Sequence, residues 1–317
     1  MFVVTLVFLS GVVGLLWAFY NYRKLSEIDC KLPQAREEEE KKLLDSFDPI
    51  SIGAIIEEGA SAFILAEYKI MAIFIVVMGA IVYLCVDGME DFTTTIAFAI
   101  GAVTSMFCGA FGMKVATYSN YRTTLEAQHS LGRGFKTAYR AGCVIGFTLV
   151  AISSMVLMVI ILFYKDYFDL EDSSKEGNYY EEMFEAIAGY GLGGSTIALF
   201  ARVGGGIYTK AADLGSDLVG KVESGLPEDS PRNPATIADN VGDNVGDVAG
   251  MSADLFGSFA ESTCAALVIG SNSIETLDGE LDLDQIIFVL GIPAIGILAC
   301  IIVSYLITDR PEIEQGP

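Results

Sequence analysis

Long apolar stretches separated by polar ones make up most of the chain. Seven of these stretches are long enough to cross a bilayer as a helix, which takes about 20 residues. They are residues 2–20, 69–86, 96–113, 141–164, 183–201, 239–270 and 286–307. The pattern predicts an all-α, polytopic transmembrane protein in which the chain crosses the membrane about seven times.

The basic residues are distributed unevenly over the connections between these stretches. Alternate connections, with the C-terminal end, hold 17 of the 19 Lys and Arg residues, and the others hold 2. Because Lys and Arg are retained on the cytoplasmic side, the N-terminus is predicted outside or lumenal, and the C-terminus inside. Residues 202–238 are then cytoplasmic. The same pattern fits a plasma membrane and an acidic organelle equally.

Composition agrees with a membrane protein and narrows its chemistry. The chain has 317 residues, 52% hydrophobic content and a net charge of −22. The acidic excess argues against nucleic acid as a partner and for bound cations, with membrane lipid as the surroundings. A single histidine argues against histidine-based metal sites and Ser/His triads, and six cysteines without CxxC spacing indicate free thiols.

One acidic stretch, residues 204–261, interrupts the apolar pattern. Read as a helix, Asp239, Asp243 and Asp247 fall at i, i+4 and i+8, on one face. Asp254 and Glu261 follow at steps of seven residues. At about 100° per residue, all five carboxylates are predicted to share one stripe that runs from the cytoplasmic end into the membrane.

A second charged face lies just before this stripe in the sequence. It consists of Arg202, Lys210, Asp213, Asp217 and Lys221. Clustered carboxylates repel one another unless cations join them, and oxygen-only ligands favour Mg²⁺ over zinc. The lysines would supply hydrogen-bond donors to a phosphate. The two faces therefore predict a site for magnesium and a phosphate compound.

The carboxylates within the apolar segment 251–270 indicate an ion path. Intramembrane Asp and Glu are costly and mark ion or proton paths, so Asp254 and Glu261 need a counter-ion. Arg202 is the natural candidate. The chemistry leaves a passive Mg²⁺ or cation channel as an alternative, although a channel filter with basic residues beside it would repel cations.

Glycines in two places predict close helix packing. Gly242, Gly246 and Gly250 have the spacing that lets another helix approach closely. The run 189–194 formally fits GxGxxG, but it lies inside an apolar span without a preceding strand. We therefore interpret it as a packing surface and not as a dinucleotide site.

Residues 184–267 closely resemble the membrane-bound, ion-translocating inorganic pyrophosphatases. The run IYTKAADLGSDLVGKVESGLPEDSPRNPATIADNVGDNVGDVAGMSADLF (207–256) is similar to their substrate-loop signature almost throughout, and GMKVATYSNYRTTLEA (112–127) resembles another family stretch. The resemblance implies pyrophosphate hydrolysis, with Mg²⁺ as cofactor, coupled to cation pumping. It also implies a homodimer.

The resemblance assigns roles to individual residues. It implies that Lys210 contacts the substrate and that Asp213, Asp217 and Asp243 hold Mg²⁺. It places Asp247 with these metal ligands and also as the group that positions the attacking water. Further members of the polar site are Glu228 and Asp239, and the ion-transport residues are Arg202, Asp254 and Glu261.

The resemblance also sets the expected domain organisation. Family members have about sixteen membrane helices, so residues 1–317 are expected to form the N-terminal part of one domain, with residues 202–238 as its cytoplasmic substrate-binding segment. By itself the chain is expected to hold half a site and to hydrolyse pyrophosphate poorly.

The position of Glu261 predicts the transported ion. The family's gate glutamate occurs either at the position of Gly257 or at that of Glu261. The farther position, with the following STCAAL, resembles potassium-dependent proton pumps. Proton transport is therefore predicted, with sodium pumping as the alternative. Potassium dependence is left open.

Overall fold

The computed structural model describes residues 2–28, 49–171, 179–227, 229–230, 233–273 and 287–308. Within these ranges the chain is helical, with short turns and no strand, which confirms the all-α prediction. The elements are α1 (Phe2–Ser26), α3 (Pro49–Cys85), α4 (Thr93–His129), α5 (Leu131–Glu171), α6 (Tyr179–Asp217), η1 (Leu218–Glu223), α7 (Ala235–Gly242), η2 (Asp243–Ala249), α8 (Gly250–Ser273), η3 (Ile287–Leu290) and α10 (Gly291–Thr308).

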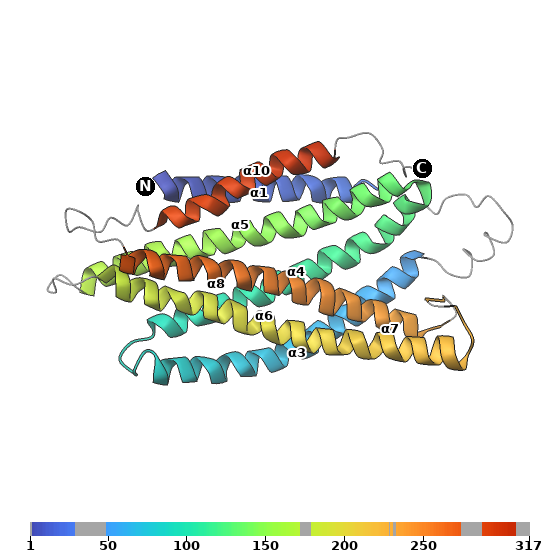
Figure 1. Ribbon diagram of the computed structural model, residues 1–317, viewed down its shortest axis with the longest axis horizontal. Coiled ribbons are helices and arrows are strands. Elements are labelled where there is room, and N and C mark those ends of the chain that lie inside the picture. The colour runs from blue at the N-terminus through green and yellow to red at the C-terminus, as the bar shows by residue number, and fades with distance from the viewer. Residues whose placement is uncertain are drawn as a thin grey trace.

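The long helices run side by side in alternating directions, so that successive connections lie at opposite ends of the bundle (Figure 1). The last turn of α1, the turn between α4 and α5 around residue 130, and the C-terminal end of α6 lie at the end drawn on the right, where α10 also ends. These are the helix ends that the basic residues predict on one side of the membrane. The predicted alternation of the chain is therefore confirmed.

Most of the helices are longer than a bilayer is thick, and they extend beyond the predicted apolar spans. Helix α4 has 37 residues and α5 has 41, or roughly 55–60 Å at a rise of about 1.5 Å per residue. Large parts of the predicted loops 21–69, 114–140 and 202–238 are helical extensions. Most of the predicted site residues that the structure describes therefore lie on helices.

Six helices in the described part of the chain are long and apolar enough to cross a membrane. Helix α8, which carries Asp254 and Glu261, is not among the six, although it lies antiparallel to α6 in the bundle. The most apolar window of α3 has a mean hydropathy of 2.2, yet only 11% of this window is buried inside the bundle. Apolar surface on this scale is typical of helices in lipid, and the chain is an integral multi-pass membrane protein.

Small residues bring α4, α6 and α8 into backbone contact. A Cβ added to Gly189 would lie 2.5 Å from the carbonyl oxygen of Thr94 on α4, and one added to Gly191 would lie 2.9 Å from the Cα of Glu261 on α8. Neither neighbour is a flexible side chain, so neither position tolerates a larger residue. This contact confirms that the run 189–194 is a packing surface.

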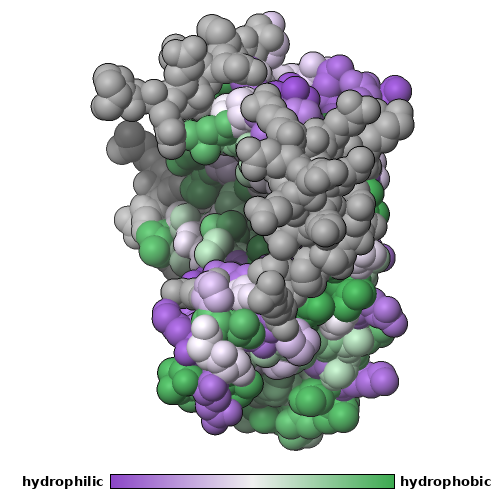
Figure 2. All heavy atoms as spheres, turned by 90° about the vertical axis from the view of Figure 1, so that its right-hand side faces the viewer, coloured by the Kyte–Doolittle hydropathy of each residue, from purple (hydrophilic) through white to green (hydrophobic). Residues whose placement is uncertain are grey.

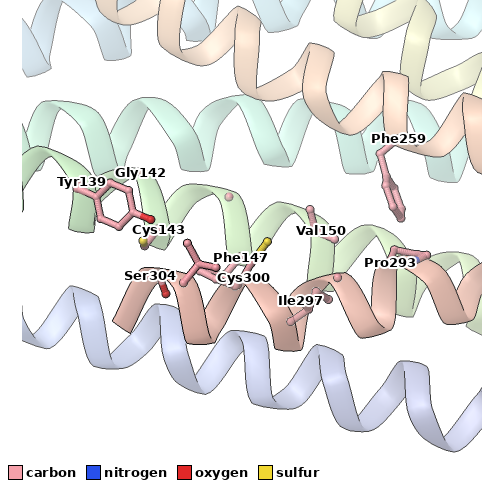
Figure 3. A pocket seen from close by; sticks show the side chains of 13 residues that line it. Tyr139, Gly142, Cys143, Phe147, Val150, Phe259, Pro293, Ile297, Cys300 and Ser304 are labelled. Atoms are coloured by element: carbon pink, nitrogen blue, oxygen red, sulfur yellow. The ribbon is translucent and has the colours of Figure 1, made fainter. Parts of the chain in front are cut away.

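The other side of the bundle contains an apolar cavity of about 620 Å³ between α5 and α10 (Figure 3). Gly142, Gly146 and Gly296 leave open space around it, and Phe259 of α8 reaches its wall. It holds no charged side chain among its lining residues. The cavity therefore has no part in the charged site described next.

Candidate functional site

The site is built where α6 crosses the continuous helix formed by α7, η2 and α8. A Cβ added to Gly205 would lie 2.7 Å from the Cα of Gly246, and one added to Gly242 would lie 2.8 Å from the Cα of Thr209. A Cβ on Gly250 would lie 3.2 Å from the Cα of a residue on α6. The predicted close approach at this glycine face is confirmed, and α6 is the approaching helix. The crossing brings the two charged faces together.

The prediction of an uninterrupted α-helix through the aspartates was wrong. Asp243–Ala249 form π-helical turns, with hydrogen bonds to the fifth residue instead of the fourth. The turn is therefore wider, and the 100° step per residue does not hold between Asp243 and Asp247. Both side chains nevertheless stay exposed, while Asn244, Val245 and Gly246 are buried against neighbouring helices.

The carboxylates at this end influence one another. Partial burial raises the pKa of Asp239 above its usual range, and the charges of Asp243 and Asp213 raise it further. The pKa of Asp243 is also raised, first by partial burial and then by Asp247 and Asp213, while Lys210 lowers it. Charges from α6 and from α7–η2 thus act on the same carboxyl groups.

Asp229 also raises the pKa of both Asp239 and Asp243 and was missed by the sequence interpretation. It lies in the connection between η1 and α7, with a positive φ of 52°. The side chain of Asn233 fastens this connection to α6 by donating a 3.0 Å hydrogen bond to the carbonyl oxygen of Ser216. Glu228, predicted as a member of the polar site, lies outside the described residues.

The basic group of the cluster is Lys210. Its Nζ lies 3.6 Å from Asp213 Oδ2, one turn along α6, and its side chain is 81% exposed. A pair this open contributes little to stability. The ammonium group therefore remains accessible to an anionic ligand in front of the carboxylates.

A cleft of about 800 Å³ with both polar and apolar lining residues lies beside the cluster, between α3, α4 and α7–η2. Asp229, Asp243 and Asn240 are among its lining residues. The amide of Asn120 on α4 donates a 3.0 Å hydrogen bond to Asn244 Oδ1 and ties η2 to the outer helices. Figure 2 views the molecule from this end and shows hydrophilic residues at its margins with hydrophobic ones exposed beside them.

The donor set fits Mg²⁺. It consists of carboxylate oxygens, and partial burial together with the neighbouring carboxylates raises the pKa of Asp239 and Asp243. A bound cation would offset both effects. Among the residues that the structure describes, no three carboxylate, His or Cys groups converge closely enough to enclose a metal. Mg²⁺ commonly uses one or two carboxylates together with water and substrate phosphates, so an open arrangement suits an ion shared with a ligand.

Further along the same helices, Arg202 Nη1 donates a 2.8 Å hydrogen bond to Asp254 Oδ2. This contact confirms Arg202 as the predicted counter-ion of Asp254. Both side chains are about half exposed at the surface formed by α6 and α8. The backbone of Arg202 lies at the crossing with Gly250, and Asp254 follows Gly250 by about one helical turn.

Glu261 has a different partner from the one expected. Its Oε2 accepts a 2.5 Å hydrogen bond from Ser195 Oγ on α6. The sequence analysis did not connect Ser195 with Glu261, because the helix that faces Glu261 was not known. Ser195 follows the glycine run that holds α6 against α8, and this proximity could have pointed to it.

The comparisons with known proteins agree along nearly the whole chain. A family profile described as "Inorganic H+ pyrophosphatase" matches residues 12–316. A protein of Clostridium tetani named a putative K(+)-stimulated pyrophosphate-energized sodium pump is 42% identical over 294 residues. Proteins of Methanosarcina mazei and Moorella thermoacetica, both named K(+)-insensitive pyrophosphate-energized proton pumps, are 33% and 40% identical over 304 and 267 residues.

The alignments cover different shares of the two chains. They include 93%, 96% and 84% of this chain, in the order given above, but 38%, 40% and 36% of the relatives. The chain therefore spans about two fifths of the length of the curated relatives that it matches.

Proposed function

The chain belongs to the inorganic H⁺ pyrophosphatase family, and we propose that it forms the N-terminal part of a membrane pump that hydrolyses pyrophosphate and moves protons. The proposal rests on two clusters of charged residues that lie along the same pair of packed helices, α6 and the continuous helix α7–η2–α8. Lys210 and the aspartates lie at one end, and the Arg202–Asp254 pair lies below them. Hydrolysis at the first group can thereby act on the second through rigid helices.

We propose that the cytoplasmic group binds magnesium pyrophosphate. Lys210 donates to a phosphate oxygen, and Asp213, Asp217, Asp243 and Asp247 hold Mg²⁺, which neutralises charge on the phosphates when it is bound. Asp247, an exposed carboxylate whose charge acts on Asp243, orients the attacking water and accepts its proton. Asp239 and Glu228 complete the polar site.

The transport group uses the carboxylates within the membrane. Asp254 is held by Arg202, whereas Glu261 has only the Ser195 hydroxyl as a hydrogen-bond partner in the described part of the chain. A carboxylate without a cation partner in an apolar segment is cheaper as a neutral acid, so it can carry a proton. A sodium site needs several converging oxygens, whereas the described contacts place only the Ser195 hydroxyl on Glu261, with the Gly257 carbonyl oxygen 3.4 Å from that hydroxyl.

Sodium pumping remains the second candidate, because the relative from Clostridium tetani is named as a sodium pump at 42% identity. The proton pumps named above lie at 33% and 40%, so identity alone favours neither ion. The names also include both K(+)-stimulated and K(+)-insensitive pumps. K⁺ is accordingly tested as an activator of the complete pump.

The basic ends of the helices favour the orientation proposed from sequence. The last turn of α1, with Arg23 and Lys24, and the start of α5, with Arg133 and Lys136, lie at the same end of the bundle as the C-terminal part of α6 with Lys210. This end is proposed to face the cytoplasm, with the N-terminus outside or lumenal. The complete pump is proposed to work as a homodimer surrounded by lipid.

Replacing Lys210 with alanine is expected to weaken pyrophosphate binding. Loss of a charge-assisted hydrogen bond costs about 1.5–3 kcal/mol, which corresponds to roughly a 10- to 100-fold rise in Kd. Titration of the full-length protein with a non-hydrolysable pyrophosphate analogue measures this directly. Lys165→Ala, near the opposite end of the bundle, serves as the control. An unchanged Kd in Lys210→Ala would remove this residue from the binding site.

A further inference from the structure

Glu67 is an ionisable residue in the middle of α3, a helix that is long and apolar enough to span a membrane. Its side chain on α3 is only 8% exposed, and no other Asp or Glu in the described part of the chain is buried. Its Oε1 has no hydrogen-bond partner among the described residues. The sequence interpretation placed it in a loop, next to the start of the span at residue 69.

The surroundings of Glu67 are apolar. Its Oε1 faces α6 at Gly204, where it lies 2.7 Å from the position that a Cβ would occupy. Two aromatic contacts between α3 and α6 flank it, Phe63 with Tyr208 at 4.8 Å and Phe74 with Phe200 at 5.5 Å between ring centroids. The missing side chain at Gly204 is what leaves room for the carboxyl group.

The position along α6 connects Glu67 with the proposed pump. Gly204 lies between Arg202, which holds Asp254, and Gly205, which packs against Gly246 of the π-helical turns. Glu67 therefore sits level with the junction between the hydrolytic and transport groups, against another side of α6. A movement of α6 at this junction would change the surroundings of the carboxyl group.

Other titratable groups on the neighbouring elements do not neutralise Glu67. They are Tyr68 and Lys69 on α3, Cys108 on α4, Arg202 and Tyr208 on α6, and Asp247 on η2. Tyr68 Oη donates to the carbonyl oxygen of Met106, Lys69 and Asp247 are exposed, and Arg202 is paired elsewhere. No ion pair to Glu67 exists within the described residues.

An ionised carboxylate in such a place would be strongly unfavourable. Burying a charge without a partner costs so much that the group normally takes up a proton and becomes neutral. Ionisable residues inside a membrane span are rare and commonly belong to proton relays. Both considerations point to a protonated carboxyl at neutral pH.

We propose that Glu67 is a proton-holding residue of the pump, a neutral acid in the resting protein that releases and regains one proton during each turnover. One O–H bond on the carboxyl breaks as the proton passes to water, and it forms again when water returns a proton. This inference rests on the proposed function. It adds a residue of α3 to the transport residues on α6 and α8.

The protonation state is tested without any pump activity. The infrared spectrum of the full-length protein at pH 7 is expected to contain a carbonyl-stretch band of a neutral carboxyl that disappears in Glu67→Gln. Glu57→Gln, an exposed glutamate on the same helix, is the matched control and should leave the band unchanged. Identical carboxyl bands in the wild type and in Glu67→Gln would overturn the proposal.

The transport role is tested by measuring hydrolysis and proton uptake together in sealed vesicles. Glu67→Gln is expected to hydrolyse pyrophosphate within about threefold of the wild type, while protons moved per pyrophosphate fall about tenfold or more, a modest figure for loss of a positioned proton-transfer group. Gly204→Ala is expected to lower the same ratio, because its methyl group would displace the end of the flexible Glu67 side chain.

The outcomes separate this inference from the proposed function. A wild-type protein that hydrolyses no pyrophosphate would contradict the proposed function and the transport role with it, whereas the infrared comparison still decides whether Glu67 holds a proton. A wild-type protein that pumps, with an unchanged ratio in Glu67→Gln, would overturn the role of Glu67 alone.

Discussion

Replacing Asp247 with asparagine or alanine is expected to abolish pyrophosphate hydrolysis by the full-length protein. Asp247 lies in the π-helical turns with its side chain exposed, and its charge acts on Asp243. Asparagine keeps the shape but cannot accept a proton from water, so the rate should fall by roughly 10²–10⁴-fold, as for other general bases. Phosphate release in the presence of Mg²⁺ measures the effect.

Two controls keep this experiment specific. Asp166→Asn changes an exposed aspartate near the C-terminal end of α5, at the other end of the bundle from Asp247. This variant should leave hydrolysis unchanged. Because Asp247 is exposed, its variants should insert in the membrane and elute from a sizing column like the wild type. Near-normal turnover in Asp247→Asn would contradict its role in activating water.

Replacing Glu261 with glutamine is expected to abolish ion transport. Glu261 projects from α8 within the apolar segment 251–270, and its carboxylate accepts a hydrogen bond from Ser195. Glutamine can keep this hydrogen bond but cannot take up or release a proton. Transport should therefore fall about 100-fold or more, at the lower end of the range for loss of a proton-transfer group.

Ser195→Ala provides a graded comparison with Glu261→Gln. It removes one hydrogen bond to a charged group, worth about 1.5–3 kcal/mol, and leaves the carboxylate in place. Its transport defect should accordingly be the smaller of the two. Pyrophosphate-driven uptake by Glu261→Gln at the wild-type rate would show that another group carries the ion.

The sequence was sufficient where a feature depends on residues close together in the chain. Apolar length predicted the helices, basic residues predicted their alternation, and the spacing of Gly242, Gly246 and Gly250 predicted a close crossing. The Arg202–Asp254 pair was predictable because an intramembrane carboxylate needs a cation and few are available. These features follow from local composition and the cost of burying charge.

Other features depend on which helices become neighbours. The ends of α4 and α6 extend past the apolar runs of these helices, so the apolar pattern does not mark them. The π-helical turns at Asp243 add a wider turn that the i, i+4 pattern does not encode. Ser195 and Glu67 acquire their importance only through the packing of α6 against α8 and α3.

The most direct test of the account is pyrophosphate-driven ion uptake by the full-length protein in sealed vesicles, followed with a pH-sensitive dye and with sodium-22. We predict that the lumen becomes acidic only when pyrophosphate and Mg²⁺ are both present, and that a protonophore collapses the gradient. Parallel assays with and without K⁺ show whether K⁺ stimulates the pump. Sodium-22 accumulation that persists with the protonophore, with no acidification in its absence, would contradict proton pumping.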